Sequence, residues 1–273
     1  MYALHDPAHV LAPGLFRSLK PGDRKRLKLD VVYDFGDGHR LEFSGPEPLG
    51  VDDLRVLQGL VAMAGKNSLV LKPATETESG RELRRLIEPR WEAVREDALV
   101  ATGSYRALAL AIGYVNVDDA RTIRACIERL WKVSIIAVID GKRMGSRLLA
   151  GYASAEASIY VALNPRLTRA IVGQGGGRHA RIELAEVRGL SLDVARLLHQ
   201  RLSGWIDAGR TKSVGLDVLV GYAWPDHAEG STHRMRCKRI RAALDDLGRV
   251  GWTILESSKS TFSINRPARA RGG

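Results

Sequence analysis

LVATGSYRALALAIGYVNVDDARTIRACIERLWKVSIIAVI, residues 99–139, is the stretch from which the fold can be predicted. The apolar and β-branched residues 99–102 predict a short strand. Ser104 is a good N-cap for the helix that follows, and Gly113 is placed to end that helix in the left-handed conformation that glycine tolerates. A short strand is therefore expected to lead directly into a capped helix.

A second helix is expected from Asp118 to Trp131 or Lys132, because its apolar residues recur at helical spacing. Strands are expected after it, around the Asp140-Gly141 turn. Their expected bounds are Ser134–Ile139, Ser146–Ala153 and Ile159–Leu163. Strand, helix, short turn, helix and β-hairpin is the order of a winged helix, a helix-turn-helix unit whose hairpin forms the wing.

The same order recurs near the end of the chain. The expected elements are a strand at Val214–Leu216, helices at Asp217–Ala223 and from Ser231 to about Leu247, and a hairpin of Trp252–Glu256 and Thr261–Ile264. A helix from Ser191 to about Ile206 is expected to pack in the core of this unit. We therefore expect an α+β fold of two tandem winged-helix domains, residues 1–163 and 164–273, with the glycine-rich run Gly173–Gly177 as a linker.

The 273 residues include 42 Lys and Arg against 31 Asp and Glu, a formal net charge of +11. Such an excess favours a polyanionic partner over a basic protein with evenly spread charge. Cys126 and Cys237 form no CxxC pair, so we expect no cysteine-rich zinc site. The first residues lack the pattern of a signal peptide, and the strongest apolar run, Val133–Ile139, is too short to span a bilayer. We expect a cytoplasmic protein with no membrane partner.

The helix from Ser231 has an unusual distribution of charge. At 100° per residue, His233, Cys237, Ile240, Leu244 and Leu247 fall on one stripe that is expected to face the core. No acid occurs between Ser231 and Leu244, whereas an ordinary solvated helix mixes both signs. Arginine can fork onto guanine, and a recognition helix reads bases with its N-terminal residues. The DNA-binding candidates are Ser231, Thr232, Arg234, Met235, Arg236, Lys238, Arg239 and Arg241.

The earlier helix gives a weaker version of the same pattern. With its apolar stripe inward, its candidates for DNA contact are Arg121, Thr122, Arg124, Arg129 and Lys132. Asp118, Asp119 and Glu128 dilute this charge, so a surface or dimer-contact role stays open. The basic tail with Arg266, Arg269 and Arg271 is expected to be disordered and to attract phosphates without specificity.

The apparent catalytic motifs lack the residues that normally accompany them. Asp34-Phe35-Gly36 matches the magnesium triplet of kinases, but no glycine-rich loop or His-Arg-Asp motif accompanies it. The run Gly173–Gly177 lacks the Lys-Ser/Thr of a P-loop. The seven histidines include no His-x-His pair and no HExxH. We therefore expect no catalytic residue, no metal and no cofactor, and a nickase or primase is only a remote alternative.

Several long stretches of this chain resemble the IncQ-type plasmid replication initiators of the protein C family. The resemblance rests on HDPAHVLAPGLFR (5–17), KLDVVYDFGDGHRLEFSGPEPLGVDDLRVLQGLVAMAG (28–65), IERLWKVSIIA (127–137), ARLLHQRLSGWID (195–207), GYAWP (221–225) and GST (230–232). It covers nearly the whole length, which is more specific than any short motif.

The resemblance implies paired winged-helix domains that bind directly repeated iterons at the plasmid origin. It also implies local opening of an AT-rich stretch, followed by recruitment of a plasmid-encoded helicase and a primase. The protein itself would have no enzyme activity. A winged-helix transcriptional repressor or autoregulator is the main alternative, which would bind a palindrome as a dimer rather than direct repeats. A homodimer is an arrangement that the sequence leaves open.

Overall fold

The computed structural model describes residues 1–268 other than 37, 68, 73, 75–76, 88–96, 117–119, 156–157, 173–178 and 258–259. The glycine-rich run predicted as a linker lies outside these described residues. Within them, no helix is long and apolar enough to cross a membrane. Helices and antiparallel sheets both contribute to the described part of the chain, which fits the α+β prediction.

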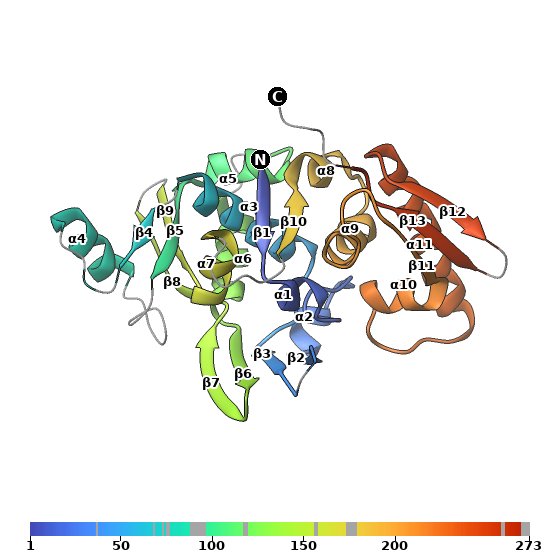
Figure 1. Cartoon of the computed structure of the whole chain (residues 1–273), viewed down its shortest axis with the longest axis horizontal. Helices are drawn as coiled ribbons and strands as arrows, with labels where there is room; N and C mark the ends of the chain where they lie inside the picture. Colours follow the sequence, from blue (N-terminus) through green and yellow to red (C-terminus); the bar gives the residue numbers. More distant parts are fainter. Residues whose placement is uncertain are drawn as a thin grey trace.

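The C-terminal unit lies at one end of the molecule (Figure 1). It consists of helices α9 (Asp193–Trp205), α10 (Leu216–Ala223) and α11 (Gly230–Arg249), with strands β11 (Thr211–Gly215), β12 (Thr253–Ser257) and β13 (Thr261–Asn265). The strands form an antiparallel sheet in the order β11-β13-β12. The strand between α9 and α10 thus pairs with the last strand of the terminal hairpin.

The N-terminal half repeats this arrangement. Its corresponding elements are α3 (Val51–Asn67), β5 (Ala98–Ser104), α5 (Tyr105–Ile112), α6 (Ala120–Trp131), β8 (Leu149–Ala155) and β9 (Ser158–Leu163). The strands of this set, together with β4 (Val70–Leu71), form a sheet in the order β4-β5-β9-β8. Here too the strand before the first short helix pairs with the last strand of the unit, so the repeat seen in the sequence extends to the sheet topology.

One expectation about the first unit is wrong. The predicted strand 146–153 is two strands, β7 (Lys142–Arg147) and β8, which separate at Leu148. The hairpin of β6 (Ser134–Ile139) and β7 pairs with β2 (Leu29–Asp34) and β3 (Arg40–Gly45) in the order β2-β3-β6-β7. The hairpin directly after α6 is therefore an insertion, and β8 with β9 occupies the place of the C-terminal hairpin.

Local sequence signals set the ends of the helices. The Ser104 hydroxyl accepts the Ala107 N–H at 3.0 Å, as predicted for an N-cap. Gly113 ends α5 with φ 74°, in the left-handed region, as its sequence position predicts. The long helix α11 differs from expectation, because Glu229 is its N-cap residue and Ser231 lies inside the first turn. No side-chain hydrogen bond caps α11.

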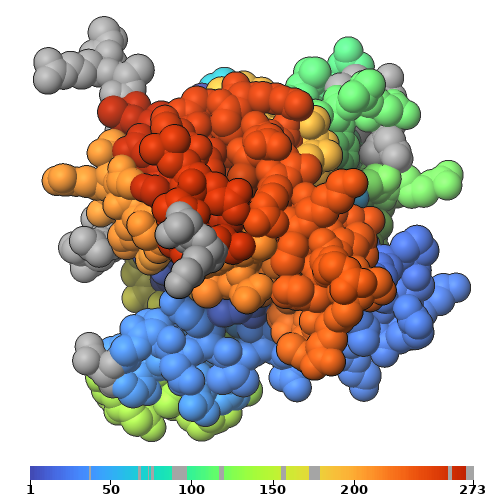
Figure 2. Space-filling view, turned by 90° about the vertical axis from the view of Figure 1, so that its right-hand side faces the viewer, coloured from blue at the N-terminus to red at the C-terminus, as the bar shows by residue number. Residues whose placement is uncertain are grey.

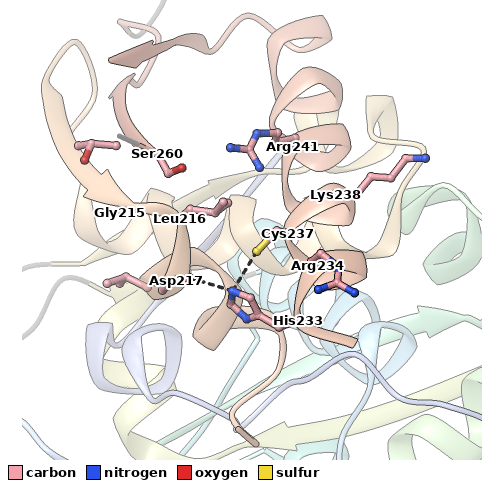
Figure 3. Close-up of a pocket in the computed structure, with 11 residues that line it drawn as sticks. Gly215, Leu216, Asp217, His233, Arg234, Cys237, Lys238, Arg241 and Ser260 are labelled. Atoms are coloured by element: carbon pink, nitrogen blue, oxygen red, sulfur yellow. Dashed lines mark hydrogen bonds and ion pairs between the residues drawn. The ribbon is translucent and has the colours of Figure 1, made fainter. Parts of the chain in front are cut away.

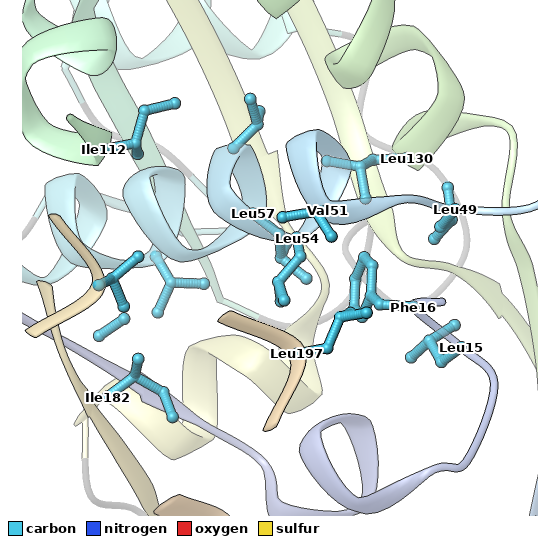
Figure 4. Packing of buried hydrophobic residues seen from close by; sticks show 14 of the residues in the cluster. Leu15, Phe16, Leu49, Val51, Leu54, Leu57, Ile112, Leu130, Ile182 and Leu197 are labelled. Atoms are coloured by element: carbon cyan, nitrogen blue, oxygen red, sulfur yellow. The ribbon is translucent and has the colours of Figure 1, made fainter. Parts of the chain in front are cut away.

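A continuous apolar core joins the two units (Figure 4). Leu54 and Leu57 of α3 lie in it together with Leu197 of α9 and Phe16 of the N-terminal segment. The Gln58 amide donates to the Gln200 amide oxygen at 2.7 Å, so α3 and α9 also share a buried hydrogen bond. Side chains from both sides of the predicted boundary at residue 163 therefore contribute to one core.

The beginning of the chain crosses the same boundary. Strand β1 (Tyr2–His5) pairs antiparallel with β10 (Ala180–Glu183), and α1 (Pro7–Leu11) packs on α9. The remaining helices are α2 (Asp23–Arg26), α4 (Glu78–Ile87), α7 (Pro165–Val172) and α8 (Leu184–Gly189). Because β1 completes a sheet with a strand beyond residue 163, the N-terminal segment ties the two units together.

Candidate nucleic-acid interface

Helix α11 presents one apolar and one cationic face. Ile240, Ala243, Leu244 and Leu247 are buried against α9, α10 and β12, as the helical spacing predicts. On the opposite face, Ser231, Arg234, Met235, Lys238 and Arg239 are all exposed. Five of the eight predicted α11 candidates therefore lie on the solvent side of the helix.

The cations on this face are not neutralised by the protein. Among the described residues, the side chains of Arg234, Lys238 and Arg239 have no hydrogen-bond or ion-pair partner. Like charges so close together on a helix repel each other and destabilise it slightly. An external polyanion relieves this repulsion, since each phosphate contact releases condensed counterions. The exposed N-terminal half of α11 is therefore suited to a phosphate backbone.

Arg236 lies on the other side of the helix, with 3% of its surface exposed. Its guanidinium donates to the Asp226 carbonyl at 2.6 Å and forms an ion pair with the Asp226 carboxylate. It also lies 5.5 Å from the centre of the Trp224 ring. Burial opposes ionisation of Asp226, but the hydrogen bond and charge of Arg236 hold the pKa of this carboxyl below its usual value. Arg236 thus fastens the α10–α11 turn and does not reach the exposed face.

The N-terminal segment approaches the same turn. Arg17 forms an ion pair with the Asp226 carboxylate, and Gly14, at φ +83°, lies against Pro225. Figure 2 shows this end of the molecule, with the C-terminal unit in orange and red and the N-terminal segment in blue beside it. The start of α11 is therefore held by contacts from a segment more than 200 residues earlier, since Arg17 and Asp226 are 209 positions apart.

The remaining candidates of α11 lie at the edges of the cationic face. Arg241 forms an ion pair with Glu256 of β12 at 2.8 Å, which links the helix to the terminal hairpin. Thr232 is half-buried in the first turn. A depression of about 820 Å³ is lined by the N-terminal half of α11, the start of α10 and the end of β11 (Figure 3). Arg234, Lys238 and Arg241 line one wall of this depression, so it shares the positive charge of the helix.

Helix α6 offers fewer exposed cations. Arg121 and Lys132 are exposed, and neither side chain has a partner among the described residues. Arg124 is also exposed, but its guanidinium lies 5.5 Å from the centre of the Tyr105 ring and donates to the phenol oxygen at 3.4 Å. Thr122 is half-buried. The α6 surface is therefore a weaker version of the α11 surface, as its mixed sequence predicts.

Arg129, another α6 candidate, is half-buried and its charge is paired within the protein. Its guanidinium donates to the fully buried Asp53 carboxylate at 2.8 Å. The same carboxylate accepts hydrogen bonds from Arg24 at 3.0 Å and from the Gly50 N–H at 2.8 Å. Burial opposes the charge on Arg129, but Asp53 raises the pKa of the guanidinium above its ordinary value. Arg129 therefore ties α6 to the start of α3.

The expectation of a disordered basic tail is wrong for Arg266. This residue is 7% exposed, and its guanidinium donates to the carbonyls of Ile206 at 3.0 Å and Arg181 at 2.6 Å. It holds the last strand against the centre of the molecule. Arg269 and Arg271 lie outside the described residues.

Two further basic residues, absent from the predicted candidates, lie in the inserted hairpin. Lys142 and Arg143 follow the Asp140-Gly141 turn and are exposed, and Arg143 forms an ion pair with Glu42 at 2.9 Å. Arg147 of the same strand lies 4.5 Å from the centre of the Trp131 ring at the end of α6. The Lys142-Arg143 pair directly after the Asp140-Gly141 turn is the sequence feature that could have identified them. The hairpin thus adds a cation, Lys142, to the α6 half of the molecule.

Three comparisons with known proteins bear on this geometry. A family model described as Replication protein C (RepC) matches residues 1–268. No curated protein sequence matches the chain. Among solved structures, the crystal structure of domains 2 and 3 of RctB is similar with a TM-score of 0.57 and 13% sequence identity. That similarity covers 97% of this chain and 99% of the RctB chain, and at this identity it concerns the fold alone.

Proposed function

The chain belongs to the replication protein C (RepC) family, and from this premise we propose that it is a plasmid replication initiator that binds directly repeated iterons in double-stranded origin DNA. The proposed DNA contact rests on the exposed face of α11, where Arg234, Lys238 and Arg239 have no partner among the described residues. Sequence-independent affinity for DNA comes from such phosphate contacts.

We propose that each unit binds DNA as a winged helix. In the C-terminal unit, α10 and α11 are the helix-turn-helix, and β12 with β13 is the wing. The N-terminal half of α11 enters the major groove, where Arg234 and Lys238 contact base edges or phosphates. The support for this assignment is the order of the elements together with the cations on the face of α11 that the core leaves free.

The N-terminal unit makes the second contact in this proposal. Helix α6 takes the place of α11, with Arg121, Arg124 and Lys132 toward the DNA, and β8 with β9 is the wing. Because one continuous core holds the two units together, they meet the duplex with little freedom to adjust. Two units in successive major grooves would bend the duplex, at a deformation energy that depends on its sequence. This strain favours opening of an adjacent AT-rich stretch.

Helicase recruitment follows from the resemblance to the IncQ-type initiators. A plasmid-encoded helicase would enter the opened stretch, and a primase would follow. The role requires no catalytic residue in this chain, so we propose that the protein is not an enzyme. It would act in the cytoplasm, where plasmid DNA is found.

Binding and opening can be tested separately. We expect tight binding to the repeats near the gene of this protein and weak binding to a scrambled duplex of equal length, across a salt series. Permanganate should modify thymines of the AT-rich stretch only when the protein is present. A preference for an inverted repeat would instead indicate a dimeric repressor, and nicking of supercoiled plasmid in magnesium would indicate an enzyme.

A further inference from the structure

A histidine, a cysteine and an aspartate meet beside the cationic face of α11. His233 and Cys237 are one turn apart on α11, and Asp217 comes from the first turn of α10 (Figure 3). The His233 Nε2 atom lies 3.3 Å from the Asp217 carboxylate and 3.3 Å from the Cys237 sulfur. The potential ligand atoms of all three residues lie within 4.8 Å of one another.

This arrangement does not fit a nucleophilic triad. In a Cys-His-Asp relay, the cysteine contacts one nitrogen of the imidazole and the carboxylate orients the other. Here the sulfur and the carboxylate both approach Nε2. A single Nε2–H cannot serve as both ends of a proton relay. The imidazole nitrogen, the thiol and the carboxylate, all within 4.8 Å of one another, are instead a set of ligand atoms that a metal ion could bind.

The two distances from the His233 Nε2 atom agree with a tetrahedral centre. Around an ion with metal–ligand bonds of ~2.0–2.3 Å, neighbouring ligand atoms lie ~3.3–3.6 Å apart. We propose that Asp217, His233 and Cys237 form a binding site for a zinc ion, with the fourth position open to the depression between α10 and α11. The Nε2 distances to sulfur and to carboxylate already lie at the short end of this range, and the sulfur and the carboxylate lie within 4.8 Å of each other.

The choice of ion follows from the chemistry of the donors. Thiolate and imidazole favour zinc and similar transition metals, whereas magnesium and calcium prefer oxygen ligands alone. Binding would release the Cys237 thiol proton to solvent, because the thiolate is the ligand. One thiolate and one carboxylate then balance the two charges of the ion. Arg234, Lys238 and Arg241, which line the same depression, would therefore surround a neutral centre rather than a divalent cation.

The bound ion would join the two helices of the C-terminal helix-turn-helix. Asp217 lies on α10 and the other two ligands lie on α11, so the metal fixes the angle between them. It would do so beside Arg234 and Lys238, within the turns that carry the exposed cations. The metal proposal concerns binding of an ion and stands whether or not α11 contacts DNA.

Sequence spacing alone could not reveal this site. The absence of CxxC, His-x-His and HExxH patterns predicted no metal, and a His-x₃-Cys pair is none of these. The third ligand comes from a different helix, 16 residues before His233. Only the packing of α10 on α11 brings it within reach.

Cobalt(II) is a suitable probe, because its bond to a thiolate gives a charge-transfer absorption in the near ultraviolet. We expect the full-length, metal-free protein to develop this band on titration with cobalt, and zinc to displace it. Cys237→Ser should abolish the band, and His233→Ala or Asp217→Ala should weaken binding at least ~10-fold. Cys126→Ser is the matched control, since Cys126 is fully buried in the other half and should leave the band unchanged.

A second measurement uses the unaltered chain and does not depend on how the variants fold. Zinc should slow alkylation of Cys237 by iodoacetamide and raise the Tm, as expected for a ligand that binds only the folded state. No thiolate band at millimolar cobalt would overturn the proposal. So would a band that survives Cys237→Ser, or alkylation that zinc does not slow. DNA is absent from these experiments, so their failure would leave the proposed function untouched.

Discussion

The guanidinium of Arg236 is buried against Asp226, donating to its carbonyl at 2.6 Å, while Arg234, two residues earlier on α11, is exposed. Neighbouring arginines of one helix thus have opposite orientations. Arg236 connects α11 to the turn before it, and Asp226 connects that turn to Arg17 of the N-terminal segment. The two groups of cations are therefore expected to respond differently to substitution.

Removal of the outward cations should weaken DNA binding without unfolding the protein. For the double variant Arg234→Ala with Lys238→Ala, we expect the slope of log affinity against log salt to fall by about 2, since each phosphate contact contributes about 0.9. The Tm should change little, because neither side chain has a partner among the described residues. Fluorescence anisotropy at several salt concentrations measures the slope. Lys66→Ala, which removes an exposed lysine of α3 away from the α11 face, is a control and should leave the slope unchanged.

Removal of the inward cation should have the opposite effect. Arg236→Ala leaves the Asp226 carboxylate without its main partner and opens a space beside Trp224. Because Asp226 is still half-exposed, we expect a loss of about 1–3 kcal/mol in the free energy of unfolding. Urea denaturation measures the loss. Arg239→Ala, an exposed neighbour, should cost less than about 0.5 kcal/mol, and equal losses for the two variants would contradict the assignment.

The stability should fall in acid through Asp246. This buried carboxylate of α11 accepts the N–H groups of Ser191 and Leu192 at 2.8 Å each and so caps α9. Burial opposes ionisation, but these hydrogen bonds hold the pKa of Asp246 below its ordinary value of 3.8. A lowered folded-state pKa means that the contribution is complete above the unfolded value and is lost as the pH falls through the folded value.

Asp246→Ala tests this account of the acid sensitivity. At pH 7 we expect a loss of about 1–2 kcal/mol in the free energy of unfolding, the usual cost of removing a helix cap. Below pH 4 the difference between the variant and the original protein should shrink. Urea denaturation from pH 7 to pH 3 measures both, and a difference that stays constant throughout would argue against the ionised cap. Asp245→Ala, an exposed neighbour, is the control.

The two units should unfold together. Gln58 and Gln200 share a buried hydrogen bond of 2.7 Å between α3 and α9, inside a core that both units form. Gln58→Ala leaves Gln200 unpaired and should cost about 1–3 kcal/mol. Calorimetry of this variant should show one transition at a lower Tm. Two separated transitions, with only the first moved, would instead indicate independently folding domains.

Much of the fold could be predicted from local patterns. Ser104 and Gly113 mark the ends of α5 by chemistry that acts within one turn, and the stripe of Ile240, Leu244 and Leu247 predicts which face of α11 is buried. The inserted hairpin was misplaced because its alternating pattern fits either sheet. Its pairing of Ile135 with Phe43 depends on contacts between residues 92 positions apart in the chain.

The cationic site was predictable only in part, because its ion pairs also join residues of different elements. A helical wheel places Arg236 and Arg129 at the edge of the polar face, but their acidic partners come from other elements. Asp226 lies in a turn and Asp53 lies on α3, and no spacing within α11 or α6 identifies either. Arg266 was assigned to a loose tail because the backbone carbonyls that it reaches, at Ser203, Ile206 and Arg181, carry no sequence signal.

Iteron recognition is tested most directly by the binding of the full-length protein to two duplexes at physiological salt. One carries the direct repeats of its own origin, and the other carries the same repeats with alternate copies inverted. We predict a higher affinity for the direct repeats, and a loss of affinity for both duplexes with Arg234→Ala and Lys238→Ala. Equal affinity for both duplexes and for scrambled DNA, with the steep salt dependence of pure phosphate contacts, would contradict the account.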